Sequence, residues 1–127
     1  MVKRKFLTAW LGVTLLAVPP PARAGEISHI MHSWRQAQSE VDAMLRGGAR
    51  YDPARLQQAM AAYVADASHL AGRMNTGTAD GQDLQRRFLN FAALGQQTAA
   101  DISRPDLFRT DFSEVKAQCD SCHAIYN

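Results

Sequence analysis

Residues 25–127 of the chain are predicted to fold as an all-α, up-down-up-down antiparallel four-helix bundle. In four segments, apolar or small residues recur at alternating steps of four and three, the spacing of helices packed in a bundle. No segment shows the apolar-polar alternation of a half-buried strand. The connections between the four segments are short, which makes consecutive helices antiparallel neighbours.

The segment 1–24 is predicted to be a cleaved secretory signal peptide. It begins with the basic run 1–5, continues with the almost wholly apolar run 6–18, and ends with the A-x-A cleavage site Ala22-Arg23-Ala24. The apolar run is too short to span a membrane, although an uncleaved membrane anchor is the rival interpretation. Cleavage would leave 25–127 as one exported domain, which is expected to be soluble in the periplasm.

The charge balance argues against nucleic acid as a partner. The full sequence has 14 basic and 12 acidic residues, a formal net charge of +2. Four of the basic residues belong to the signal peptide, so the remaining domain has ten basic and twelve acidic residues, a net charge of −2. Nucleic-acid binding requires a basic patch on the folded part of a protein, and no such patch is expected here.

The first two predicted helices are separated by Gly47-Gly48 and Asp52-Pro53. The glycines are a C-terminal signal for the first helix, and Asp52 with the following proline suits the N-cap and first turn of the second. The second helix is expected to end around residues 75–77. The core-facing positions of the first helix are Ile27, Met31, Trp34, Gln38, Val41 and Leu45. Those of the second are Leu56, Met60, Tyr63, Ala67, Leu70 and Met74.

The third and fourth predicted helices are separated by Pro105. The core-facing positions of the third are Leu84, Phe88, Phe91, Gly95, Thr98 and Ile102. Those of the fourth are Phe108, Phe112, Val115, Cys119, Cys122 and Tyr126. Both cysteines therefore lie on the core-facing side of their helix, and a group attached to them would face the interior of the bundle.

The stretch Cys119-Asp120-Ser121-Cys122-His123 has the form Cys-x-x-Cys-His, which attaches a c-type haem. Each thiol adds to one haem vinyl group, and His123 reaches the iron as the proximal axial ligand. The alternatives are a redox-active cysteine pair and half of a zinc site. A zinc site needs a second Cys or His pair, and the chain has two cysteines in all. A thioredoxin-type motif has a strand before it and a helix after it, whereas this motif closes the sequence. One covalent haem c is therefore expected.

The sequence resembles the cytochrome c-prime family of exported four-helix haem proteins. The matching parts are Cys119-x-x-Cys122-His123-x-x-Tyr126, Phe112 and Val115 before it, and Arg46-Gly47 with Tyr51-Asp52. Two features depart from the family pattern. The arginine that often follows the tyrosine is replaced by Asn127, and the region between the second and third helices is shorter than usual. The layout is also similar to the exported b-type cytochrome bundle, in which methionine and histidine hold a non-covalent haem.

Met31 is the expected distal iron ligand. In an up-down-up-down bundle the start of the first helix lies beside the end of the last, so Met31 and His123 should lie at similar height and point inward. The resemblance agrees, because the family places its distal-side residue at this position, with methionine in its low-spin members. The alternative is that Met31 lies beside an open iron.

The other methionines and the histidines are weaker candidates. Met44 lies thirteen residues beyond Met31, roughly 20 Å along a helix. Met60 is expected toward the opposite end of the bundle as a core residue, and Met74 diagonally across from the haem helix. The histidines that flank the core-facing positions, expected to be solvated or bonded to a neighbour, are His29, His32 and His69.

The predicted function is that of a periplasmic electron carrier, which exchanges electrons with redox partner proteins and is not an enzyme. The alternative is a five-coordinate haem protein that binds a small diatomic gas, nitric oxide or carbon monoxide. A peroxidase-like enzyme ranks last, because no distal histidine and arginine pair is placed to support it. Besides the ligands, the pocket is expected to be walled by Trp34, Leu84, Phe88 and Tyr126.

The charged pairs Arg86-Arg87 and Glu40-Asp42 are interpreted as solvated helix faces. Members of the resembling family dimerise through their first two helices, so the resemblance allows a homodimer. Polar residues on these helices are equally suited to facing water: Arg35, Gln36, Arg55 and Gln58.

Overall fold

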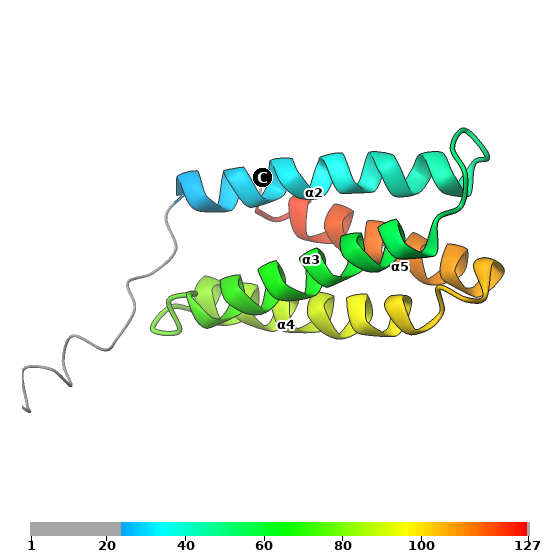
Figure 1. The fold of residues 1–127 in the computed structure, drawn as a ribbon. Coiled ribbons are helices and arrows are strands. Elements are labelled where there is room, and N and C mark those ends of the chain that lie inside the picture. The colour runs from blue at the N-terminus through cyan, green and yellow to red at the C-terminus, as the bar shows by residue number, and fades with distance from the viewer. Residues whose placement is uncertain (1–23, 127) are drawn as a thin grey trace, which may run out of the picture.

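The computed structural model describes residues 24–126, and within them the secondary structure consists of α-helices without strands (Figure 1). In chain order the helices are α2 (Ala24–Leu45), α3 (Pro53–Gly72), α4 (Ala79–Ala100) and α5 (Pro105–His123). The prediction of an all-α domain with four helices is thereby confirmed. The predicted signal peptide lies outside the described residues except for Ala24, which begins α2, and Asn127 also lies outside them.

The connection between α2 and α3 has the structure expected from its glycines and its Asp-Pro pair. Gly47 has a φ of +80°, the left-handed conformation that favours glycine after a helix. The amides of Gly48 and Ala49 donate to the Ala43 carbonyl at 2.9 and 3.1 Å. Asp52 is the N-cap of α3, and its carboxylate accepts from the amides of the second and third residues after it. Both boundaries predicted here are confirmed.

The α3–α4 connection begins earlier than the sequence indicated. α3 ends at Gly72, so that Met74 follows the helix instead of lying in its last turn. Thr78 caps α4 by accepting from the amide of Gly81 at 3.0 Å. A Cβ at Gly81 would lie 1.7 Å from the Asn75 carbonyl oxygen, so the chain folds back tightly against the start of α4. This tight turn uses residues that the apolar spacing had assigned to α3.

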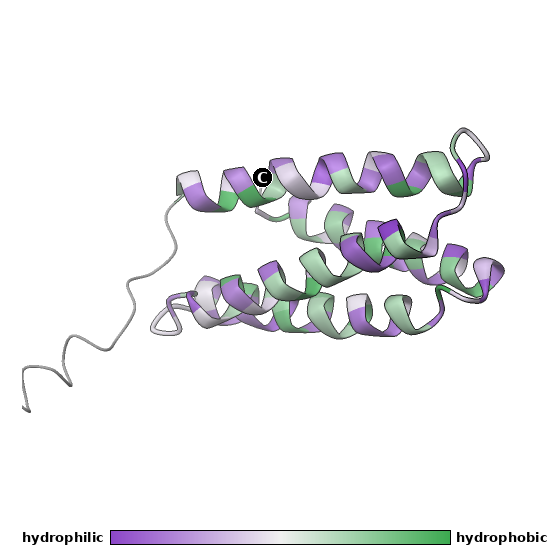
Figure 2. Cartoon of the chain, in the orientation of Figure 1, coloured by the Kyte–Doolittle hydropathy of each residue, from purple (hydrophilic) through white to green (hydrophobic). Residues whose placement is uncertain are grey.

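The buried side chains follow the predicted core-facing positions. Figure 2 shows hydrophilic and hydrophobic residues alternating along each helix, as expected of helices with one buried face. Predicted positions that are buried are Trp34, Val41, Leu56, Met60, Tyr63, Ala67, Leu70, Phe88, Phe91, Gly95, Thr98, Ile102, Phe108, Phe112 and Val115. Those that are only half-buried are Ile27, Met31, Gln38, Leu45, Met74, Leu84, Cys119, Cys122 and Tyr126.

Polar bonds between helices join segments that are distant in the sequence. Glu26 at the start of α2 accepts from His69 at 2.8 Å and from Arg73 at 2.7 Å, at the end of α3. Lys116 of α5 donates to Asp42 of α2 at 3.1 Å. Each helix packs against the next one along the chain. Glu26 therefore connects α2 to α3, and the half-buried Asp42 connects α2 to α5.

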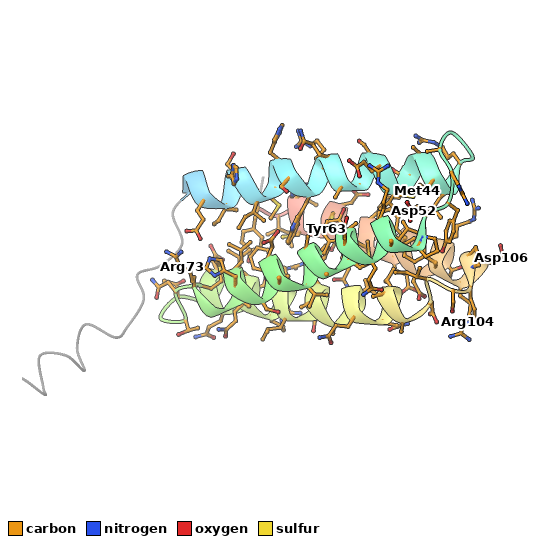
Figure 3. The ribbon with its side chains drawn as sticks, in the orientation of Figure 1. Met44, Asp52, Tyr63, Arg73, Arg104 and Asp106 are labelled. Atoms are coloured by element: carbon orange, nitrogen blue, oxygen red, sulfur yellow. The ribbon has the colours of Figure 1, made fainter. Side chains whose placement is uncertain are left out.

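The two ends of the molecule can be followed in Figure 3. Arg73 lies at one end, whereas Met44, Asp52 and Arg104 lie at the other, with Tyr63 between them. No helix in the described residues is both long enough and apolar enough to cross a membrane.

Candidate functional site

The Cys-x-x-Cys-His motif is helical over its whole length. Because α5 continues to His123, Cys119, Cys122 and His123 occupy positions i, i+3 and i+4, which share one face of a helix. The two thiols are half-buried and free, and the imidazole is exposed. The amides of Ala124 and Tyr126 donate to the carbonyls of Asp120 and Cys122 at 3.0 and 2.9 Å, which closes the end of α5.

A cavity lies on this face of α5, between α5, α4 and α2. It encloses about 720 Å³ of empty space, including the space at its open mouth. Its lining includes the four residues predicted to hold the cofactor: Met31, Cys119, Cys122 and His123. The remaining lining residues are Trp34, Arg86, Arg87, Phe88, Asn90, Phe91, Gln118 and Ser121. The fold thus brings the four predicted cofactor-holding side chains to one cavity.

The inner wall of the cavity is aromatic. Trp34 stacks on Phe91 with ring centroids 4.7 Å apart and an interplanar angle of 13°, and it meets Phe88 and Tyr63 edge to face. The indole N–H donates to Asp66 at 3.1 Å, and the Tyr63 hydroxyl donates to the Trp34 carbonyl at 3.0 Å. The Trp34 ring is therefore held in one orientation by stacking and by a hydrogen bond. A flat, mostly apolar group such as a porphyrin suits this wall.

The rim of the cavity is polar. Arg86 and Arg87 both line the cavity. The interpretation of this pair as a solvated helix face holds for Arg86, whose side chain is 61% exposed, and is wrong for Arg87. Arg87 is only 24% exposed, and its Nε donates to Asp83 at 2.8 Å. Leu84 and Tyr126, which were expected as walls, are not among the lining residues. The Tyr126 hydroxyl instead donates to Asp83.

The environment of the two thiols keeps them protonated. Burial, together with the nearby carboxylate of Asp120, raises the pKa of Cys119 to about 11. Burial also raises the pKa of Cys122, an effect that the charge of Arg87 partly offsets. The reactive thiol of a redox-active cysteine pair has a lowered pKa. The raised pKa values therefore weigh against the redox-active alternative for this motif.

The rival iron ligands lie elsewhere. Of the four methionines in the described residues, Met31 alone lines this cavity. Met44 is buried in the core, and Met60 is buried beside a shallower groove between α3 and α4. The histidines His29, His32 and His69 are exposed. Within residues 24–126, no three His, Cys, Asp or Glu side chains converge on a point that could hold a bare metal ion.

Two carboxylates at the site, Asp83 and Asp66, belong to none of the sequence motifs. Asp83 precedes Arg86 by three residues and Arg87 by four, and this helical pair spacing was a usable signal. Asp66, by contrast, is 32 residues from the indole that it accepts from, and no local pattern relates the two.

Comparisons of the chain with family models, with curated proteins and with solved structures found no match.

Proposed function

We propose that this chain is a periplasmic c-type cytochrome that carries electrons on one covalently attached haem c. The observation that supports this most strongly is the position of Cys119, Cys122 and His123 on one face of α5, where all three line a cavity with an aromatic inner wall. It has no substrate of its own and exchanges electrons with redox partner proteins. The cytochrome c-prime resemblance of the motif and of the helix-joining residues points the same way.

The proposal includes an up-down-up-down antiparallel topology for the haem-bearing bundle. Three polar contacts support it. Glu26 at the start of α2 bonds to Arg73 after the end of α3, and Tyr126 after the end of α5 bonds to Asp83 near the start of α4. At the other end, the hydroxyl of Tyr51, before α3, donates to the carbonyl of Ile102, after α4, at 2.6 Å.

In this proposal four residues at the cavity bind the haem directly. Cys119 and Cys122 would hold the haem through thioether bonds, and His123 and Met31 would supply ligands to its iron. When bound, the haem would supply the redox chemistry, and a methionine sulfur ligand would raise its reduction potential. Trp34 and the aromatic wall restrict the access of water.

A second function, binding of nitric oxide or carbon monoxide by a five-coordinate iron, is favoured by one observation. The cavity is open to solvent and Met31 is only half-buried, so a small gas has a route to the distal side. A peroxidase-like role is weaker. Arg86 and Arg87 line the cavity, but the three histidines outside the motif, His29, His32 and His69, do not.

The deciding experiment is a visible absorption spectrum of the purified exported protein, oxidised and reduced, with and without carbon monoxide. An electron carrier with Met31 on the iron is expected to give a low-spin spectrum with a weak far-red sulfur-to-iron band, and to bind carbon monoxide slowly. A high-spin spectrum with immediate binding would support the gas-binding alternative. A polypeptide without any haem absorption, whose thiols react with a thiol reagent, would overturn both.

Export and assembly are tested on the same material. If the signal peptide is cleaved, the mass of the mature protein should correspond to a chain that begins at Gly25. Light scattering distinguishes a monomer from the homodimer that the resemblance allows.

A further inference from the structure

Tyr126, which follows the end of α5, is hydrogen-bonded to α4. The hydroxyl of Tyr126 donates to the carboxylate of Asp83 at 2.7 Å, across 43 positions of sequence. The same carboxylate accepts from Arg87 at 2.8 Å and also from Arg86. The guanidinium carbon of Arg87 lies 6.0 Å from the centre of the Tyr126 ring, within the range of a cation–π contact. We call Asp83, Arg86, Arg87 and Tyr126 the clasp.

The charges of the clasp reinforce one another. Hydrogen bonds from Arg87 and then from Tyr126 hold the pKa of Asp83 well below its usual range. The hydrogen bond to Asp83 raises the pKa of Tyr126 to about 12. Near neutral pH the carboxylate is therefore ionised and the phenol keeps the proton that it donates. A hydrogen bond to an ionised acceptor is stronger than one between neutral groups.

Apolar packing contributes little at this end of α5. The buried side chains of α5 are Phe108, Asp111, Phe112 and Val115, all in its first eleven residues. After them, Cys119 and Cys122 are half-buried, while His123 and Ile125 are exposed. The last turns of the helix, which carry the motif, therefore depend on polar contacts for their position. The clasp supplies such contacts, and Arg87 is close enough to Cys122 for its charge to act on that thiol.

We propose that Asp83 is a positioning residue, which through Tyr126 and Arg87 sets where Cys122 and His123 lie relative to the cavity. This rests on the proposed function, because only a bound iron makes the position of His123 matter. Isolated exposed ion pairs contribute little. Here one carboxylate joins two cations and a phenol, and the side chains of Asp83 and Arg87 are 27% and 24% exposed, so the contacts act as a network.

The first test needs no haem signal. Amide hydrogen exchange is measured on the full purified chain and on Tyr126→Phe, with Tyr51→Phe as the matched control. Tyr51 also donates its hydroxyl across the bundle, to the Ile102 carbonyl at the opposite end. Tyr126→Phe is expected to speed exchange of the amides of residues 124–126 by about tenfold, since it removes one hydrogen bond to a charged group. Tyr51→Phe should leave these amides unchanged. Equal exchange rates of these amides in Tyr126→Phe and in the unmodified chain would show that the clasp does not hold the end of the chain.

The second test separates positioning from a purely structural role. In the haem-loaded protein, Asp83→Asn and Tyr126→Phe are expected to shift the reduction potential and the far-red sulfur-to-iron absorption band, with the larger shift for Asp83→Asn. Tyr51→Phe should shift neither. If the amides of residues 124–126 exchanged faster while the reduction potential and the band stayed unchanged, the positioning role would be refuted. If the unmodified protein carried no covalent haem, the proposed function would fail, whereas the exchange measurement would still decide whether the clasp exists.

Discussion

The two halves of the bundle are built differently. The half around Met44, Leu56, Phe108 and Phe112 is closed by apolar packing, and all four side chains are at most 7% exposed. The stacked rings of Phe108 and Phe112, 5.9 Å apart, fill its centre. The other half contains the cavity, and there Met31 and the motif cysteines are only half-buried. We call these the closed half and the open half.

The difference indicates where stability and function reside. Burial of apolar side chains is the main favourable contribution to folding, and the closed half provides most of it within α5. In the open half, apolar packing is confined to the aromatic wall of the cavity, and the end of α5 lacks it. Polar contacts such as the clasp and the bonds from His69 and Arg73 to Glu26 hold this half together. A covalently held, largely apolar cofactor would add the missing contacts in the open half alone.

The largest expected effect is that of removing both attachment thiols. Cys119→Ala with Cys122→Ala should abolish covalent haem altogether and loosen the open half, because the cofactor contacts there are lost. Haem staining after denaturing gel electrophoresis measures the attachment, and hydrogen exchange locates the loosening. Haem that still migrates with the double variant, or loosening that is strongest around Phe112, would contradict the comparison.

A core truncation in the closed half should have the next largest effect. Phe112→Ala removes a ring that is 1% exposed and should lower the free energy of unfolding by about 3–5 kcal/mol. Leu107→Ala, at an exposed position on the same helix, is the control and should change it by less than about 0.5 kcal/mol. Denaturant unfolding of both variants checks the pair. A loss below about 1 kcal/mol for Phe112→Ala would mean that the closed half does not dominate stability.

Two methionine variants, one in each half, should affect different measurements: stability in the closed half and the visible spectrum in the open half. Met44→Ala should lower the free energy of unfolding by about 2–5 kcal/mol, since Met44 is buried, and leave the visible spectrum unchanged. Met31→Ala should cost roughly 1–2 kcal/mol at its half-buried site, open the sixth iron position and lower the reduction potential. Spectra and unfolding curves of both variants decide. An unaltered spectrum for Met31→Ala would show that another residue is the distal ligand.

The smallest effect concerns a carboxyl pair at the corner between α4 and α5. Asp111 is 8% exposed, its Oδ2 makes no hydrogen bond, and bonding to Asp101 together with burial raises its pKa to about 6. A raised folded-state pKa adds stability when the group is protonated. This contribution is complete below the unfolded pKa near 4 and is lost as the pH rises through about 6.

The matching variant is Asp111→Asn, whose amide can still donate to Asp101. It should raise the free energy of unfolding by about 1 kcal/mol at pH 8 and by little at pH 4.5. Denaturant unfolding at the two pH values measures this. Asp106→Asn, at an exposed position in the first turn of the same helix, is the control and should leave the pH profile as it is. An equal gain for Asp111→Asn at both pH values would exclude the titration of Asp111 as its cause.

Much of the fold was predictable because its signals are local. The Gly47 turn, the Asp52 cap and the proline that opens α5 are set by backbone conformations that few residues adopt. The early end of α3 was not predictable from spacing. Met74 continues the apolar repeat, but the tight packing of Gly81 against Asn75 ends the helix first.

For the candidate site, the motif could be recognised from the sequence, whereas its surroundings could not. The spacing of Cys119, Cys122 and His123 is a local signal of a c-type haem, and helical geometry alone puts the three on one face. The bond from Trp34 to Asp66 joins residues far apart in the sequence, and so does the bond from Tyr126 to Asp83. Spacing along one helix contains no information about such pairs.

The sequence by itself determined the presence of four helices, the boundary between α2 and α3 with its Asp52 cap, and the motif, because each depends on neighbours within a few residues. Only the tertiary structure decided that Arg86 and Arg87 turn toward the cavity and that Tyr126 leaves the core to bind Asp83. The physical reason is that a long charged or phenolic side chain at the surface of a helix has several positions of similar energy. The packing of α4 against α5 selects one of them.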